Sequence, residues 1–192
     1  MTLEQFVNVW WDTAIAPRVA DGSLAPKTEQ DYKRTLEGYV LPDWGSLKLK
    51  AIDAPCVMGM YRQIRQSASE AMADRVLTKL NLVFDAARRW KYIRDNPVAD
   101  ARKDLPAYQP SERPALSHAA CRDLLATVEP YRLGTAYHVL LILGVRIGEL
   151  CGLQWTDIAW DQQTLTISRQ AQDMRGGLQL RPTPKTAAGR RT

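Results

Sequence analysis

The spacing of the apolar residues changes near residue 153, and this change restricts the possible folds more than any other feature of the chain. Before it, apolar side chains recur at intervals of three and four, as on one face of an α-helix. After it, apolar and polar residues alternate over 164–168 and 178–181, as in half-exposed β-strands. Gly176-Gly177 lies between these stretches and predicts a hairpin. The sequence therefore predicts a mainly helical protein with a small antiparallel sheet.

Four helices are expected in the first hundred residues. Each begins at a residue whose side-chain oxygen accepts a hydrogen bond from the backbone of the first turn. The expected starts are Thr2, Thr28, Asp53 and Ser69, and Pro17 and Pro42 are expected to end the first two helices. The fourth helix has one apolar stripe at helical spacing, made of Val76, Leu80, Val83, Ala87 and Trp90. Helices of this kind predict a compact bundle.

A segment rich in proline and charge follows Asn96-Pro97 and predicts a linker between domains. Beyond it, Ser117 caps another predicted helix, and a very apolar helix is expected over residues 133–143. These two helices predict a second core. The expected domains are 1–97, a linker at 98–115, and 116–192.

The composition excludes several classes of protein. No apolar run approaches the roughly 18 residues of a membrane span, and no secretion signal begins the chain. The 3 cysteines are far apart and the 2 histidines stand alone, which argues against a disulfide framework and a zinc site. We therefore expect a cytoplasmic protein without a metal. The net charge of +5 favours an anionic partner but does not identify one.

A short motif follows the most apolar stretch of the chain. It runs Gly144-Val-Arg-Ile-Gly-Glu-Leu150 and is followed by Leu153-Gln-Trp-Thr-Asp-Ile158. Arg146 stands at the expected start of a short helix, and Glu149 follows three residues later, so the two side chains share one face. Such a pair alone is most often a solvated surface ion pair. Its interpretation therefore depends on the surrounding segments.

These segments resemble the tyrosine recombinases of the phage-integrase family. G-x-R-x-G-E-L followed by L-x-W-x-D-I is similar to the family's segment around its first catalytic arginine, which corresponds to Arg146. The segment Thr183-Pro-Lys-Thr-Ala-Ala-Gly-Arg-Arg-Thr192 is similar to the element that carries the family's catalytic lysine, here Lys185. The first hundred residues match the family's core-binding domain at Ala25-Pro-Lys-Thr28, Val40-Leu-Pro-x-x-Gly45, Phe84-Asp-Ala-Ala87 and Asn96-Pro97.

The resemblance implies a mainly α fold. It begins with a four-helix, SAM-like core-binding domain that binds DNA. The N-terminal part of an α+β tyrosine-recombinase catalytic domain, with a small antiparallel sheet, follows the linker. The implied function is site-specific recombination of double-stranded DNA, as in the integration of a mobile element, with no cofactor. Full-length members are expected to assemble on DNA with other recombinase protomers.

The resemblance also implies roles for individual residues. Arg146 would clamp the scissile phosphate, whose transition state gains negative charge. Glu149 would hold Arg146 or a neighbouring catalytic group in place, and Lys185 would protonate the departing 5′ oxygen. Plain alternatives remain open: Glu149 as a helix cap, and Lys185 as a lysine that keeps a sheet edge soluble.

The family's H-x-x-R segment does not occur in the 192 residues, and all 7 tyrosines precede Arg146. In the family the tyrosine nucleophile lies near the C terminus. The chain is therefore expected to be a truncated form of a recombinase that is inactive in strand cleavage. The sequence specifies neither the target site nor the direction of the reaction.

Five residues of the first domain are candidate contacts to DNA phosphates, although single basic residues on helices are usually only solvated. They are Lys27, Thr28, Arg34, Arg75 and Lys79. Two other functions remain open. One is a non-catalytic DNA-binding remnant or short product that occupies recombination sites, and the other is a helical adaptor that binds a protein.

Overall fold

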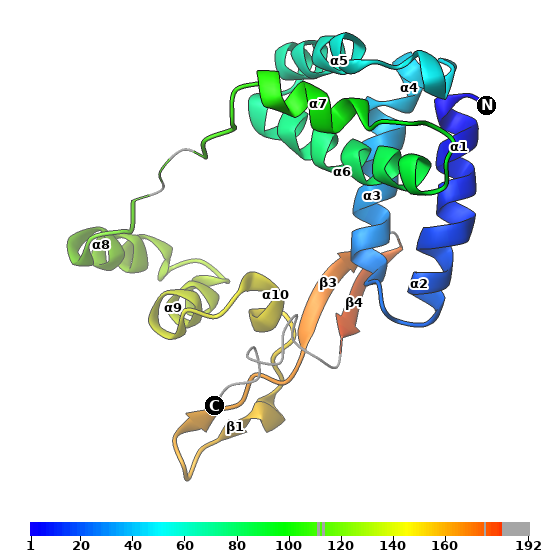
Figure 1. Ribbon diagram of the computed structural model, residues 1–192. Helices are drawn as coiled ribbons and strands as arrows, with labels where there is room; N and C mark the ends of the chain where they lie inside the picture. The colour runs from blue at the N-terminus through cyan, green and yellow to red at the C-terminus, as the bar shows by residue number, and fades with distance from the viewer. Residues whose placement is uncertain (111, 113, 175, 182–192) are drawn as a thin grey trace. The chain divides into compact units, whose positions relative to one another are not determined.

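The computed structural model describes residues 1–110, 112, 114–174 and 176–181 of the chain. Helices dominate, and two small antiparallel sheets complete the described part, which confirms the predicted fold class (Figure 1). Internal contacts divide the chain into two units, Met1–Ser111 and Glu112–Thr192.

The first unit is helical. Its elements are α1 (Leu3–Trp10), a π-helical turn (Trp11–Ile15), α2 (Ala16–Ala20), α3 (Pro26–Tyr39), α4 (Leu41–Trp44), a 3₁₀ turn (Leu49–Ala51), α5 (Ala54–Ser67), α6 (Glu70–Arg89) and α7 (Pro97–Asp104). The core lies around α6, which contacts α1, α3, α5 and α7. The predicted stripe of α6 is buried from Val76 to Ala87, and Trp90 is half-buried beside it.

Three of the four predicted helix starts are confirmed by their hydrogen bonds. The backbone N–H of Cys56 donates to the Asp53 carboxylate at 2.9 Å, and that of Met72 donates to Ser69 Oγ at 3.1 Å. Thr2 forms the predicted reciprocal pair with Gln5. The start predicted at Thr28 is wrong by two residues, because α3 begins at Pro26, whose fixed φ suits the first helical position.

Pro17 does not end the first helical segment, contrary to the prediction. A π-helical turn precedes it, in which the backbone N–H of Ala16 donates to the carbonyl of Trp11, five residues earlier. Proline lacks a backbone N–H and clashes with a carbonyl in a regular helix. The wider turn accommodates this clash, so the chain continues as α2.

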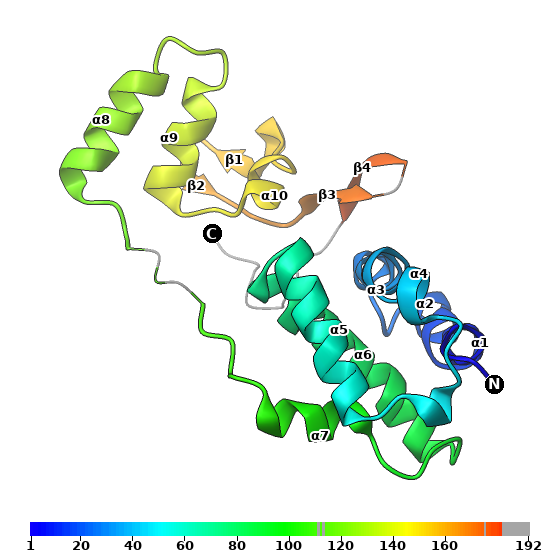
Figure 2. The ribbon, with the colours of Figure 1, turned by 90° about the horizontal axis from the view of Figure 1, so that it is seen from above.

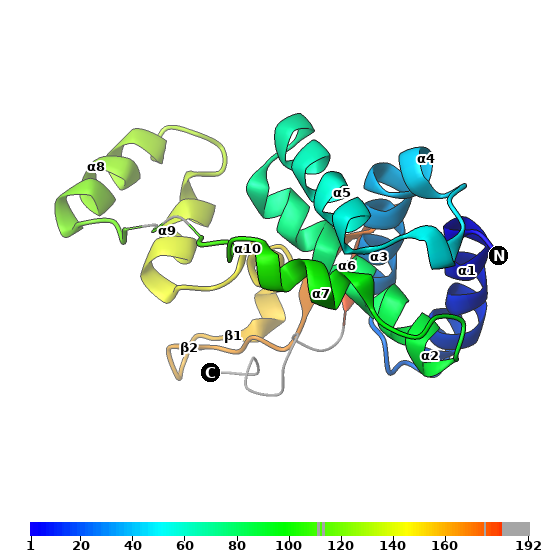
Figure 3. The ribbon, with the colours of Figure 1, turned by 45° about the horizontal axis from the view of Figure 1, so that its top comes forward.

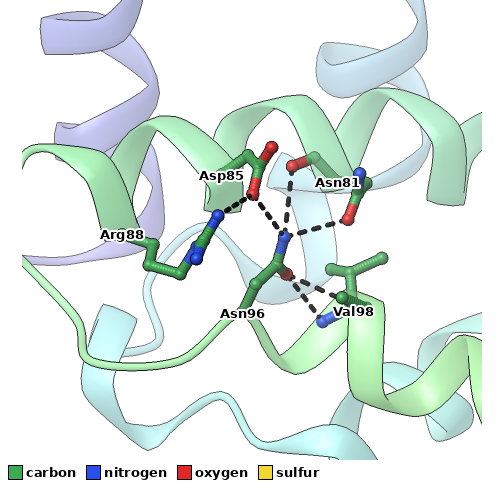
Figure 4. Close-up of polar contacts among 6 residues, drawn as sticks. Asn81, Asp85, Arg88, Asn96 and Val98 are labelled. Carbon is green, nitrogen blue, oxygen red and sulfur yellow. Dashed lines mark hydrogen bonds and ion pairs between the residues drawn. The ribbon is translucent and has the colours of Figure 1, made fainter.

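The linker predicted at 98–115 begins too early, because α7 belongs to the first unit. Asn96 is buried, and its side-chain oxygen accepts hydrogen bonds from the backbone N–H groups of Val98 and Ala99 at 2.9 and 3.3 Å. Its amide donates to the Asn81 side chain at 2.9 Å, which ties the start of α7 to α6 (Figure 4). α7 packs against α5 and α6 (Figure 3), and its Val98 is buried. Asn96-Pro97, which predicted only the end of the helical domain, therefore also starts a helix.

The second unit contains short helices and strands. Its elements are α8 (His118–Val128), α9 (Gly134–Leu143), α10 (Ile147–Leu150), a 3₁₀ turn η3 (Trp155–Asp157), β1 (Ile158–Ala159), β2 (Thr164–Leu165), β3 (Gln170–Met174) and β4 (Gly177–Arg181). β1 pairs with β2, and β3 pairs with β4, so that Gln170 lies opposite Arg181. The glycine turn is confirmed, but the strand around Leu165 pairs with β1 instead of entering the hairpin with β4.

The second core expected around α8 and α9 is not enclosed by the described residues. The two helices lie side by side (Figure 2), yet neither buries an apolar side chain fully. Ile142 of α9 is 71% exposed, although helices apolar on all sides are normally surrounded by other elements. Among the described residues of this unit, the buried hydrophobic ones are Val145, Ile167 and Ala171. In the described ranges no helix is long and apolar enough to cross a membrane.

The difference in burial along α6 predicts a difference in stability. Phe84 is completely buried, whereas Leu82 on the same helix is 39% exposed. We expect Phe84→Ala to lower the free energy of unfolding by about 3–5 kcal/mol and Leu82→Ala to lower it by less than about 1 kcal/mol. Urea unfolding of the full chain, followed by circular dichroism, measures both. Equal losses would contradict the placement of the core.

Candidate phosphate-binding site

The link between α9 and α10 places Arg146 at a helix start. Gly144 ends α9 in the left-handed region, at φ +60°, and its backbone N–H donates to the Leu140 carbonyl at 3.1 Å. Val145 is buried, and Arg146 then takes an extended conformation directly before α10. The first glycine of the motif is thus needed for a backbone conformation that other residues rarely adopt.

The carboxylate of Glu149 binds both the backbone and the side chain of Arg146. One carboxylate oxygen accepts the backbone N–H of Arg146 at 2.9 Å, and the other accepts Nη1 at 2.8 Å. The Glu149 side chain is 1% exposed. A buried carboxylate requires such compensation, because its charge has lost the solvation of water. The expected proximity of the two side chains is therefore confirmed, while their roles in catalysis stay predictions.

The guanidinium of Arg146 remains open to solvent. Its side chain is 62% exposed, although one nitrogen is held by Glu149. A guanidinium carries five N–H donors in a rigid plane, and the contact to Glu149 at 2.8 Å uses one nitrogen of this group. Two such donors match two oxygens of a phosphate. The geometry thus provides an oriented, positively charged fork for an anion.

The glycines of the motif allow α10 to lie directly on β3. A side chain at Gly148 would place its Cβ 2.8 Å from the carbonyl oxygen of Ala171. At Gly152 a Cβ would lie 3.0 Å from the Cα of Gln170. The first distance leaves no room for a methyl group and the second is tight, so β3 packs closely against the helix that carries Glu149.

Two of the candidate contacts of the first unit, Arg75 and Lys79, bind Asp31 of α3. Its carboxylate binds Arg75 Nη2 at 3.0 Å and Lys79 Nζ at 2.7 Å. The Lys79 side chain is only 9% exposed and its ammonium lies 5.8 Å from the Tyr32 ring centre. In this structure the charge of Lys79 joins α3 to α6, and its role as a phosphate contact stays a prediction.

The remaining candidates of the first unit differ in exposure. Lys27 and Arg34 are exposed and share with Asp31 one face of α3, while Thr28 is half-buried. The Arg75 side chain is 55% exposed. The ion pairs at Asp31 thus bring Arg75 beside this face of α3. Lys185 lies outside the described residues.

One pair was not predicted. Arg169 binds the carboxylate of Asp157, with distances of 3.0 Å from Nη2 to Oδ1 and 3.2 Å from Nη1 to Oδ2. Asp157 belongs to the L-x-W-x-D-I segment, but no local pattern indicates which of the later basic residues would bind it.

The tyrosines of the first unit differ in exposure, from 36% for Tyr92 and Tyr108 down to the buried Tyr61. Tyr61 is 3% exposed, and its hydroxyl has no hydrogen-bond partner among the described residues. Burial, and next the charge of Glu70, raise the pKa of this phenol, which makes it a poorer nucleophile.

Solved structures with the same fold are DNA integrases. The chain is 20% identical to the Tn1549 transposon integrase solved in complex with a circular intermediate DNA, with a TM-score of 0.79. The match covers 100% of this chain and 60% of the Tn1549 chain. It is 20% identical to a lambda integrase solved as a dimer bound to a COC′ core site, with a TM-score of 0.70, over 95% of this chain and 49% of that one. Comparison with the curated proteins gives no significant match.

The family is shown by the sequence itself. Residues 8–104 match the family model of the phage integrase central domain. The chain therefore belongs to the phage integrase family. It spans about 60% of the length of the Tn1549 integrase chain.

The close approach of α10 to β3 generates a prediction about Gly148. We expect Gly148→Ala to displace α10 from Ala171 and to cost about 1–3 kcal/mol of stability. Gly59→Ala is the control, since Gly59 lies on α5 with open space around it, and there alanine should be neutral or stabilising by up to about 1 kcal/mol. Hydrogen exchange should rise in α10 and β3 for Gly148→Ala alone. Unchanged exchange there would refute the close packing.

Proposed function

We propose that this chain acts in site-specific DNA recombination, binding duplex DNA and contributing Arg146 to the grip on the scissile phosphate. The main support is the Arg146 side chain, which is 62% exposed while the buried carboxylate of Glu149 binds one of its nitrogens. Membership of the phage integrase family supports the assignment. The related integrases were solved with circular intermediate DNA and with a core site.

The proposed chemistry is the transfer of a DNA phosphoryl group to a tyrosine hydroxyl of the complete enzyme. The transition state carries extra negative charge on the phosphoryl oxygens, and a fixed guanidinium stabilises it without reorganisation. Glu149 keeps the fork in place. Lys185 would protonate the 5′ oxygen as its bond to phosphorus breaks. Because the chain spans about 60% of a related integrase, the complete reaction is proposed for an enzyme that also holds the nucleophile.

The distribution of charge supports an anionic partner. Residues 169–192 contain six of the 26 basic residues and one of the 21 acidic ones. The other 168 residues therefore carry 20 of each and are neutral overall. The excess of +5 thus lies entirely in the segment that begins beside β3 and includes Lys185. Concentrated positive charge of this kind attracts the DNA backbone.

The assembly and surroundings of the protein are proposed by analogy. A lambda integrase was solved as a tetramer bound to a Holliday junction, and we infer that full-length copies likewise assemble on DNA. Integration or excision of a mobile element fits the transposon relative. The cytoplasm, where thiols stay reduced, fits a chain whose three cysteines are all free.

A second candidate function is DNA binding without cleavage. The first unit favours it, because this unit has a complete core and carries the exposed group Lys27, Arg34 and Arg75. Such a protein would occupy recombination sites and compete with a full-length enzyme.

A salt titration of binding to duplex DNA tests the proposed function. If four to six phosphates are contacted, the logarithm of affinity should fall with that of salt at a slope between about −3.5 and −5.5. Arg146→Ala should weaken binding about tenfold and make the slope about 0.9 less steep. Arg122→Ala, an exposed arginine of α8, is the control and should change little. A flat response of the unsubstituted chain would favour the protein-binding adaptor.

Two basic residues of the first unit should respond in opposite ways. Arg34→Ala should weaken DNA binding and leave stability within about 0.5 kcal/mol, because Arg34 is exposed. Lys79→Ala should cost about 1–3 kcal/mol of stability, because Asp31 loses one of its two cationic partners, and should leave the salt slope unchanged. Thermal unfolding and binding to random duplex measure both quantities. A less steep salt dependence of DNA binding in Lys79→Ala would identify Lys79 as a phosphate contact.

A further inference from the structure

The ion pair between Asp157 and Arg169 is the second buried carboxylate–arginine pair of the second unit. Both nitrogens of the guanidinium end bind both oxygens of the carboxylate, at 3.0 and 3.2 Å. The side chains are 6% and 25% exposed. A two-pronged contact fixes orientation as well as distance, so the pair locks the two backbone segments that carry it.

Asp157 connects these segments by further hydrogen bonds. Its carboxylate accepts the backbone N–H of Gln154 at 2.8 Å, which holds the turn η3. Its backbone carbonyl accepts the N–H of Thr166 at 2.9 Å. Residues 154–157 are thus tied to residues 166–169 at two points.

Arg169 stands where β3 meets α10. The carbonyl oxygen of Arg169 lies 3.2 Å from the position of a Cβ on Gly152, and the next residues, Gln170 and Ala171, lie against Gly152 and Gly148. α10 in turn carries Glu149, which binds Arg146. A continuous series of contacts therefore leads from Asp157 through β3 and α10 to the exposed guanidinium.

We propose that Asp157 and Arg169 form a positioning pair for Arg146. The pair fixes the start of β3, β3 supports α10, and α10 presents Glu149 with its bound arginine. Neither residue of the pair contacts the phosphate, because the Arg169 fork is engaged by Asp157. The inference rests on the proposed function of Arg146 as a phosphate contact.

A double-mutant cycle with Arg146 tests the proposal in the full chain. Asp157→Asn keeps the size of the side chain and an acceptor for Gln154 but removes the charge that holds Arg169. Binding to a short duplex at low salt should fall about tenfold for Arg146→Ala in the original chain and less than about twofold in the Asp157→Asn background. Unfolding of the whole second unit would also remove the Arg146 effect, so hydrogen exchange is measured alongside: it should rise at α10 and stay unchanged at α8.

A matched control and a milder variant complete the experiment. Asp100→Asn breaks the 2.7 Å pair with Lys103 in the first unit, and there Arg146→Ala should keep its full tenfold effect. If Asp157→Asn does not fold, Arg169→Lys keeps the charge but not the two-pronged contact, and it should reduce the Arg146 effect to about threefold.

The outcomes separate the inference from the proposed function. A full tenfold effect of Arg146→Ala in the Asp157→Asn background would overturn the positioning role and leave the phosphate contact intact. No effect of Arg146→Ala in the original chain would overturn the phosphate contact itself. A salt slope less steep by about one in the double variant Asp157→Ala/Arg169→Ala, with the Arg146 effect retained, would make Arg169 a direct phosphate contact and refute the proposal.

Discussion

The buried carboxylate of Glu149 is the interaction on which the candidate site depends. Removed from water, it needs donors, and the backbone and guanidinium of Arg146 supply them. The same contact starts α10 and leaves the outer donors of the guanidinium exposed. A longer-range ion pair between Asp157 and Arg169 stabilises the start of β3, the strand on which this helix packs. The second unit thus obtains a defined site from two buried charges instead of a large core.

The two units solve the problem of stability differently. The first buries a continuous set of apolar side chains around α6 and joins its helices by polar contacts at Asp31 and Asn96. The second has few fully buried hydrophobic residues among those described, and α9 exposes Ile142. Its order near the site relies on glycines that permit close backbone contact and on directional ion pairs. Such contacts hold a few side chains accurately, which is what recognition of a phosphate requires.

Local patterns predicted the parts of the fold that local interactions decide. The caps at Asp53 and Ser69 and the stripe of α6 follow from neighbouring residues, and the proximity of Arg146 to Glu149 follows from helical spacing. Tertiary contacts decided the rest. Pro17 continues a helix because a π turn absorbs its clash, and Lys79 is buried because Asp31 of another helix meets it. The partner of Asp157 is twelve residues away, directly before β3, a strand whose pairing the alternation of apolar residues did not specify.

Nuclear magnetic resonance of the arginine side-chain nitrogens tests most directly whether Glu149 presents Arg146 to DNA. In the free chain the Arg146 guanidinium should give distinct nitrogen signals that merge with those of flexible arginines in the Glu149→Gln variant, because the 2.8 Å contact slows its rotation. Added duplex should shift the Arg146 signals in the original chain. Signals that match flexible arginines in the free chain, or that do not move with DNA, would contradict an oriented phosphate fork.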